Sequence, residues 1–455
     1  MPEKILIRLG RMPAIRKMLR TPFAAHVAGL LIIAAIKRID KGDKPNAINV
    51  LVFNSMRFRQ DIEVLARHPR LRLYAMPTRA IELVQAIFSD PGHTPRNDYY
   101  LEEDPVILAL REKIRAYIAI IAPYLKLRGL DCSVTPSIQY NNEQDWAAGL
   151  DAGGFPFIGL HKEFTISDEK DVVRRIGRHR ELRRKFLGSY LLVTNENARR
   201  LFSESSVFPR EKIQVMGLLR MDRLFDPNSP YRRRKNQKPQ AILFSFGHFS
   251  GGIASPEKRS HYFSQNDDFG FVQLFGDVHA AFAEMAIANP DVDFKIKPKN
   301  VEDWWIREIE AVTRSATGRS ISEIPNLSIV STTAPELIRD ASVVIGFNST
   351  VLLESLILGR MTVLPVFAEA ATKYPDNVHL IKYREAFSVA SSKAELKELI
   401  GQGIANQASR SDAGRMHEMM QFYLGFDDGR SLDRFVRYLD EYLATDAGKL
   451  KRSAA

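Results

Sequence analysis

Residues 327–367 read LSIVSTTAPELIRDASVVIGFNSTVLLESLILGRMTVLPVF, and this stretch decides the fold. Three short apolar runs alternate in it with two segments that carry helix signals. Pro335 suits the first turn of one helix, and Gly359 suits the end of the other. We therefore expect strands over 327–330, 342–346 and 361–367, with helices over 335–340 and 351–358. This β-α-β-α-β order is typical of a parallel sheet.

The turn between the second strand and the second helix carries the candidate chemistry. Asn348, Ser349 and Thr350 follow Gly346 where the helix should begin, so backbone N–H groups and hydroxyls meet at a helix N-terminus. Such a terminus carries about half a positive charge and binds phosphate well. Glu354 lies on the same helix face, where its carboxylate can accept hydrogen bonds from sugar hydroxyls. The alternative is that the serine and threonine cap the helix only for stability.

Length and composition indicate two globular domains with an excess of positive charge. The chain has 455 residues, of which 45% are hydrophobic and 26% charged, and its formal net charge is +11. This charge favours anionic partners such as a membrane surface, a nucleotide or an acidic acceptor. The basic residues are not interleaved with aromatic ones as in nucleic-acid modules, so no nucleic acid is expected. The single Cys132 fits a reducing compartment, and without CxxC or HExxH motifs no bound metal is expected.

Residues 1–46 differ from the rest because basic and apolar residues alternate before an apolar run over 23–36 that ends in Lys37 and Arg38. This run of fourteen residues, apolar apart from His26, is too short to span a bilayer, and no clear small-residue cleavage site of a signal peptide follows. We expect a basic amphipathic helix lying at a membrane surface. The alternative is a helix packed on the protein's own core.

The remaining chain is expected to form two Rossmann-like α/β domains. Residues 226–239 (DPNSPYRRRKNQKP) have almost no apolar content and are the clearest linker. The expected organisation is a first domain over 47–230, a second over 238–425, and a closing segment over 426–455 whose helix, 431–443, returns to the first domain.

Polar residues follow several predicted strands of the first domain. A strand over 48–53 runs into a loop with Asn54 and Arg57, and a strand over 133–139 leads to Asn141 and Glu143. Open α/β sheets place reacting groups at the carboxyl ends of their strands.

The strand over 155–160 ends at His161 and Glu163, either of which can act as a general base if its pKa is tuned. A lone histidine at a strand end is usually structural, but the paired carboxylate favours function.

The second domain repeats this pattern. A strand over 241–246 ends in a glycine-rich turn with Gly247 and His248, which lets the backbone approach phosphate closely. A strand over 293–296 ends at Lys297, which adds a cation to the same crevice. A further short strand is expected over 378–381.

Four segments resemble the GT-B glycosyltransferases of capsule and surface-carbohydrate biosynthesis, including the CDP-glycerol glycerophosphotransferases and the Kdo-type capsule transferases. They are KIQVMGLLRMD at 212–222, KPKN at 297–300, GFNSTVLLESLILG at 346–359 and FYLGFDDGRSLDRFVRYL at 422–439. The third matches the S/N-S-T-x-x-x-E part of the family's turn, and Gly359 follows Glu354 by five residues where the family's glycine follows by four. In the second, Lys299 replaces the histidine of the family's K-P-H-P turn.

The resemblance implies two Rossmann-like domains facing a cleft, with the donor nucleotide on the second. Ser349 and Thr350 would hold its phosphates and Glu354 its ribose. Gly247 and His248 would face the diphosphate, and Lys297 would neutralise the leaving group. Glu163, or alternatively His161, would be the base, and no metal or other cofactor would be needed. The acceptor-side candidates are Asn54, Arg57, Asn141 and Glu143.

The expected function is transfer of a sugar or polyol phosphate from a CMP-, CDP- or UDP-linked donor to a surface glycan or lipid-linked acceptor. The expected location is the cytoplasmic face of a membrane, as a peripheral protein. Two alternatives stay open. The first is a hydrolysing nucleotide-sugar 2-epimerase of similar fold. The second is a non-catalytic scaffold of GT-B fold, which the replaced histidine favours.

Overall fold

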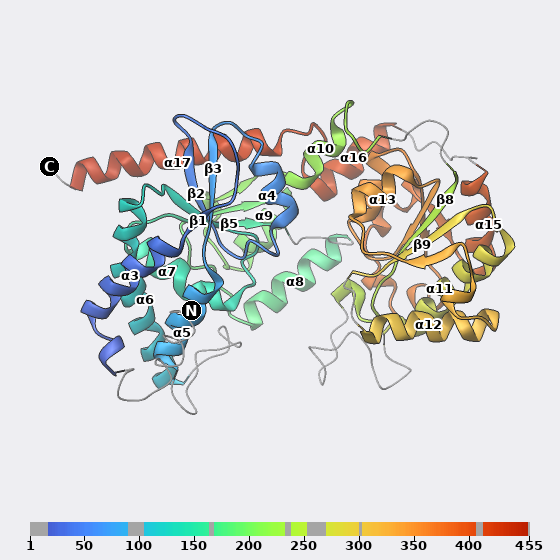
Figure 1. Cartoon of the computed structure of the whole chain (residues 1–455), viewed down its shortest axis with the longest axis horizontal. Coiled ribbons are helices and arrows are strands. Elements are labelled where there is room, and N and C mark those ends of the chain that lie inside the picture. The colour runs from blue at the N-terminus through green and yellow to red at the C-terminus, as the bar shows by residue number, and fades with distance from the viewer. Residues whose placement is uncertain are drawn as a thin grey trace. The chain divides into compact units, whose positions relative to one another are not determined.

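The computed structural model describes residues 17–89, 104–162, 168–232, 238–252, 270–299, 303–405 and 413–453. The chain divides into two compact units (Figure 1). The first comprises Met1–Phe164, Val173–Asp222 and Leu424–Ala455, and the second comprises Thr165–Val172 and Arg223–Tyr423.

The first domain contains a seven-stranded sheet in the order β1-β3-β2-β4-β5-β6-β7. Every neighbouring pair is parallel except β1 and β3. Leaving β1 aside, the chain order reverses between β2 and β4, which is the switch point where open α/β sheets form a ligand crevice. The strands are β1 (Lys37–Arg38), β2 (Ile48–Val52), β3 (Leu71–Ala75), β4 (Cys132–Thr135), β5 (Phe157–His161), β6 (Tyr190–Val193) and β7 (Ile213–Val215).

The second domain contains a six-stranded, wholly parallel sheet in the order β10-β9-β8-β11-β12-β13. This is the strand order 3-2-1-4-5-6 of a dinucleotide-binding Rossmann fold, with its switch point between β8 and β11. The predicted class, two Rossmann-like α/β domains, is confirmed. The strands are β8 (Gln240–Phe244), β9 (Asp293–Lys297), β10 (Leu327–Ile329), β11 (Val343–Gly346), β12 (Met361–Pro365) and β13 (Ser388–Ala390).

The described helices connect these strands. In chain order they are α3 (Pro22–Ala35), α4 (Arg59–Leu65), α5 (Thr78–Phe88), α6 (Pro105–Leu127), α7 (Gln144–Ala152), α8 (Glu169–Glu181), α9 (Glu196–Glu204), α10 (Asp222–Phe225), α11 (Val272–Ala288), α12 (Asp303–Thr317), α13 (Ala334–Asp340), α14 (Val351–Ile357), α15 (Lys393–Ile404), α16 (Ala413–Leu424) and α17 (Ser431–Ser453). Within the described ranges, no helix combines the length and apolar character that crossing a bilayer requires.

The stretch 327–367 folds as predicted, with element ends within two residues of the expected ones. Pro335 lies in the first turn of α13, where its missing N–H costs no hydrogen bond. Gly359 has a φ of 69° directly after α14, a backbone conformation that glycine adopts without strain.

Three predicted boundaries are wrong. The strand expected over 133–139 ends at Thr135 because Pro136 has no N–H for the sheet. The strand expected over 378–381 does not form, since Leu380 has a left-handed φ of 67°, and the last strand is β13 instead. Finally, α17 continues beyond the expected end at 443 to Ser453.

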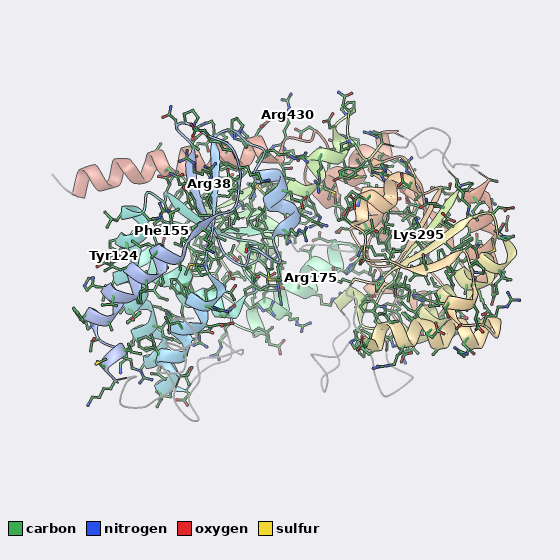
Figure 2. The ribbon with its side chains drawn as sticks, in the orientation of Figure 1. Arg38, Tyr124, Phe155, Arg175, Lys295 and Arg430 are labelled. Carbon is green, nitrogen blue, oxygen red and sulfur yellow. The ribbon has the colours of Figure 1, made fainter. Side chains whose placement is uncertain are left out.

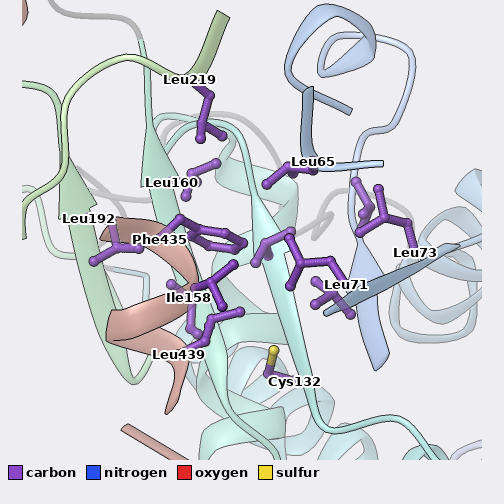
Figure 3. Packing of buried hydrophobic residues seen from close by; sticks show 14 of the residues in the cluster. Leu65, Leu71, Leu73, Cys132, Ile158, Leu160, Leu192, Leu219, Phe435 and Leu439 are labelled. Carbon is purple, nitrogen blue, oxygen red and sulfur yellow. The ribbon is translucent and has the colours of Figure 1, made fainter. Parts of the chain in front are cut away.

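The closing segment completes the core of the first domain. Phe435 and Leu439 of α17 lie among buried residues of the sheet, including Ile158, Leu160 and Cys132 (Figure 3). Side chains of a strand alternate between faces, so Val50 and Val52 of β2 join this cluster, together with residues of α4. The next residue of the chain, Phe53, instead packs against Trp146 of α7 and Phe157. Burial raises the pKa of the Cys132 thiol, which makes it an inert core residue.

Asp222 joins α17 to the end of the segment 212–222. Its carboxylate accepts hydrogen bonds from the backbone N–H groups of Ser431 (3.0 Å) and Leu432 (2.7 Å), at the first turn of α17. Asp222→Ala is expected to lower the free energy of unfolding by about 1–2 kcal/mol, because it removes this cap. Urea unfolding at about pH 5 measures the loss, because below the raised Asp222 pKa of about 6 burial of an ionised carboxylate does not offset the cap. The exposed Asp43, replaced in the same way, should change stability by less than about 0.5 kcal/mol. Equal effects of the two substitutions would contradict the capping role.

Candidate functional site

The nucleotide-site residues predicted in the second domain leave its sheet at one level. Phe244, the last residue of β8, pairs with Gly346 of β11 on one side and with Lys297 of β9 on the other. The loops after these three neighbouring strands therefore start together at the carboxyl edge, on both sides of the switch point. Six predicted residues lie at the end of one of these strands or in the loop that follows it, namely Gly247, His248, Lys297, Asn348, Ser349 and Thr350.

Asn348 ties the turn after β11 to two other loops. It has a φ of 50°, and its Nδ2 donates to the carbonyl oxygen of Asn377 (2.9 Å) and lies 3.4 Å from Ser250 Oγ. Its Oδ1 accepts from the backbone N–H of His379 (2.6 Å). Gly251 fits between these loops because a Cβ there would lie 2.0 Å from the Asn377 carbonyl oxygen. The side chain of Asn348 is therefore the link that fixes the turn.

The hydroxyl groups of this turn are partly exposed rather than covered. Ser349 Oγ lies 3.4 Å from the N–H of Val351, which is a long contact, and the Thr350 side chain makes no capping hydrogen bond. Helix α14 has only seven residues, so its dipole is short. The hydroxyls thus do not provide the tight cap that a purely stabilising role would require.

Burial sets the charge state of the neighbouring groups. It lowers the pKa of His248 to about 4, so this histidine is neutral at pH 7, and its buried ring packs against that of Phe275. Burial also lowers the pKa of the half-buried Lys297. Glu354 is buried in the first turn of α14. Its predicted contact with a ribose stays a prediction.

Three buried or partly buried side chains form a hydrogen-bonded chain at the end of β8. Trp305 Nε1 donates to Ser245 Oγ (2.8 Å), which lies 2.9 Å from His279 Nε2. The other ring nitrogen, Nδ1, lies 2.7 Å from the carbonyl oxygen of Phe275. A carbonyl only accepts, so Nδ1 carries the proton and Nε2 accepts from Ser245. Burial lowers the pKa of His279 to about 4, which keeps this arrangement neutral. No sequence motif indicated these residues.

Three of the predicted acceptor-side residues form a cluster at the switch point of the first domain. Glu143, which follows β4, accepts a hydrogen bond from Thr135 Oγ1 and is hydrogen-bonded to the side chain of Asn54, while the charge of Arg57 acts on it. The guanidinium of Arg57 lies 5.1 Å from the ring centre of Tyr140. The fourth predicted residue, Asn141, begins the same 3₁₀ turn as Glu143, Asn141–Glu143.

Glu143 has an unusual protonation equilibrium. Only 2% of its surface is exposed, and this burial raises its pKa to about 7, although Thr135, Asn54 and Arg57 each oppose the rise. A carboxyl group that titrates near neutral pH is suited to exchange protons during a reaction.

The strand expected over 155–160 is β5, which ends one residue later, at His161. Glu163 lies outside the described residues. His161 is buried, with its ring 4.9 Å from that of Phe202 and its Nδ1 3.5 Å from the N–H of Ile138. Its role as a base stays a prediction.

Sequence reasoning missed Lys162, which binds Asp61 (3.3 Å) and donates to the carbonyl oxygen of Arg57 (2.5 Å). A cation directly after a buried strand was the available signal. Among the described residues, no group of histidine, cysteine or carboxylate side chains is arranged to bind a metal ion.

No protein-family model matches the sequence, and no curated protein is similar to it. Among solved structures, the chain is similar to the UDP-GlcNAc 2-epimerase of Neisseria meningitidis bound to UDP-GlcNAc, with 13% identity, a TM-score of 0.47, and 87% of this chain and 100% of that one covered. It is similar to the UDP-GlcNAc 2-epimerase of Methanocaldococcus jannaschii, with 12% identity, a TM-score of 0.48, and 87% and 99% covered. It is also similar to the wall teichoic acid polymerase TagF, with 13% identity, a TM-score of 0.37, and 71% and 75% covered. Similarities at this level determine neither a reaction nor a substrate.

Proposed function

We propose that this chain is an enzyme of the GT-B class that binds a nucleotide-activated donor on its second domain. The observation that carries the proposal is the common level of Phe244, Gly346 and Lys297 across three parallel strands. It gathers a glycine-rich turn, a hydroxyl-rich turn and a cation at the switch point of a sheet with Rossmann strand order. These are the groups that bind a nucleotide diphosphate.

The reaction we propose is direct displacement at the donor's sugar or polyol phosphate. An oxygen of the acceptor forms the new bond while the bond to the nucleotide's terminal phosphate oxygen breaks. Backbone N–H groups, the hydroxyls of Ser349 and Thr350, and Lys297 would stabilise the negative charge on the leaving nucleotide. The acceptor's proton would pass to a carboxylate, for which Glu163 and Glu143 are the two candidates.

For the acceptor we propose a surface glycan or a lipid-linked glycan. Support comes from the resemblance of segment 346–359 to the surface-carbohydrate branch. The formal net charge of +11 also suits phosphorylated or acidic acceptors. A hydrolysing epimerase is the alternative enzyme, and it would consume the donor when no acceptor is present.

Calorimetric titration of the full chain with CMP, CDP, UDP and GDP tests the nucleotide site. We expect one of these nucleotides to bind, and Lys297→Met to weaken its affinity about 10- to 100-fold through loss of a charge-assisted contact. Lys295→Met is the matched control (Figure 2), since Lys295 lies on the same face of β9 but two residues further from the carboxyl edge and contacts Gln240. It should leave the affinity unchanged.

Absence of binding by all four nucleotides would favour the non-catalytic scaffold over the transferase. If both lysine variants bind as the unaltered protein does, the nucleotide lies elsewhere. Once a nucleotide is identified, consumption of the corresponding sugar donor without acceptor would favour the epimerase.

A further inference from the structure

Helix α3 is packed against the first domain along one side only. Its Ala25, Ala28, Gly29 and Ile32 are buried. Gly29 lies so close to Tyr124 of α6 that a Cβ would be 2.6 Å from the tyrosine ring. Tyr124 lies beside this helix in Figure 2. The inner side of α3 is therefore fixed to the protein, as one of the two sequence interpretations expected.

The outer side of α3 is apolar and exposed. Phe23, Val27, Leu30 and Leu31 are spaced by four, three and one residues, so they share one helix face, and each is between 41% and 77% exposed. The helix contains no acidic or basic residue, and its one strongly polar residue, His26, contacts Tyr124 Oη (3.0 Å). A contiguous exposed apolar face of this kind marks an interaction surface.

Cations lie at both ends of this apolar face. Lys17 and Arg20 precede the helix, and Lys37 follows it. At the second end there is a surface hollow of about 370 Å³, lined by Ala35, Lys37, Ala75, Pro77, Thr78 and Arg79. Two of its six lining residues are cations and none is acidic. The charge of this lining favours an anionic group.

We propose that the outer face of α3 docks on an anionic lipid bilayer. Phe23, Val27, Leu30 and Leu31 enter the boundary of the hydrocarbon, and Lys37 and Arg79 receive lipid phosphate groups at the hollow. Binding to such a surface becomes stronger with the apolar area that enters the acyl boundary and with the attraction of nearby cations to anionic lipids, and the outer face of α3 offers both. This inference does not depend on the proposed reaction.

Charge complementarity favours a bilayer over the other occupants of this face. The N-terminal segment 1–16 contains Lys4, Arg8, Arg11 and Arg16 but only one acidic residue, Glu3. It would therefore bring more positive charge to the cations around α3. A second copy of the chain docked through the same face about a two-fold axis would also place like charges together. Anionic headgroups complement both ends of the face.

Co-sedimentation of the full chain with vesicles tests this surface. We expect binding to vesicles of phosphatidylcholine mixed with phosphatidylglycerol, and much weaker binding to phosphatidylcholine alone. Leu30→Asp with Leu31→Asp should lower the fraction bound at least about tenfold, since two acidic residues then face the bilayer. Val173→Asp is the matched control, because Val173 is 54% exposed on α8 outside this face. It should bind as the unaltered protein does.

The charge contribution is tested by Lys37→Ala with Arg79→Ala, which should weaken binding to anionic vesicles about 10- to 30-fold and reduce its dependence on salt. All variants should keep their circular dichroism spectra and their nucleotide affinity, which separates this surface from the proposed active site. Three results would overturn the proposal. The first is absence of the unaltered protein from the vesicle pellet. The second is equal binding by the Leu30/Leu31 variant. The third is detection by light scattering of a dimer of the unaltered protein that becomes monomeric in the Leu30/Leu31 variant.

Discussion

Asn348→Ala is expected to weaken nucleotide binding at least about a hundredfold and to lower the free energy of unfolding by about 2–4 kcal/mol. The alanine removes the donor to the Asn377 carbonyl and the acceptor for the His379 N–H. It also leaves a residue with a Cβ at a φ of 50°, where asparagine is tolerated better than alanine. The turn with Ser349 and Thr350 then loses the link that holds it beside the loop after β8.

Two further substitutions at Asn348 separate these causes. Asn348→Gly relieves the backbone strain but does not restore the hydrogen bonds of the asparagine side chain. Compared with Asn348→Ala, it should therefore be about 1 kcal/mol more stable, with little recovery of nucleotide affinity. Asn348→Asp keeps the acceptor for His379, but it replaces the donor to the Asn377 carbonyl by a carboxylate oxygen and places a negative charge beside the expected phosphates, so affinity should fall further than in Asn348→Ala. Urea unfolding and nucleotide titration measure the two properties. Affinity that follows stability in all three variants would mean that Asn348 acts only through folding.

The position of the predicted nucleotide-site residues at one edge of the second sheet was predictable, because it depends only on the order and direction of the strands. Parallel strands share a carboxyl edge, so Gly247, Lys297 and Asn348 had to meet once the strands were correctly identified. Side-chain direction and burial were not predictable in this way. The chain formed by Ser245, His279 and Trp305 joins residues 34 and 60 positions apart, and no local pattern records such a pairing.

The N-terminal segment illustrates a second limit of sequence reasoning. A surface helix and a helix packed on the core were treated as alternatives, but α3 has one side of each kind. The small residues Ala25, Ala28 and Gly29 allow close packing against α6, while the large residues Phe23 and Leu30 point outward. The order of small and large side chains contained this information, whereas mean hydropathy did not.

The resemblance of segment 212–222 to a glycosyltransferase motif has a structural explanation in this chain. Asp222, its last residue, holds the start of α17, and α17 in turn fills the core of the first domain. A shared motif can therefore report a shared connection between segments rather than contact with a substrate.

Glu143→Gln is expected to make the protein more stable and less active at pH values above 7. Burial raises the folded-state pKa of Glu143 from 4.5 to about 7. A raised pKa means that the protonated form stabilises the fold. That stabilisation is complete below about pH 4.5 and is lost as the pH rises through about 7. Glutamine reproduces the neutral form of the side chain. Near pH 8 the free energy of unfolding of the variant should therefore be about 2–3 kcal/mol higher than that of the unaltered protein, whereas near pH 4 the two values should be similar. Urea unfolding across this range measures the difference, and Asp222, whose pKa is raised to about 6, titrates equally in both proteins and cancels.

The activity of the same variant distinguishes a working carboxylate from a structural one. If ionised Glu143 accepts the acceptor's proton or holds Asn54 and Arg57 in place, kcat/KM of the unaltered protein should rise through about pH 7, the pKa of Glu143. The glutamine variant should lose that rise and be about 100-fold or more slower at the high-pH end, with nucleotide affinity unchanged. Thr135→Val is the control, since it removes the hydroxyl that donates to Glu143 but keeps the carboxyl group, and it should shift the pH midpoint upward without abolishing turnover.

A gain in stability with full turnover at every pH would mean that Glu143 is buried for the fold alone. Loss of both properties would mean that its charge is needed to assemble the loop after β4. Only higher stability together with lower turnover in Glu143→Gln would show that the ionised Glu143 destabilises the fold but is required for the reaction.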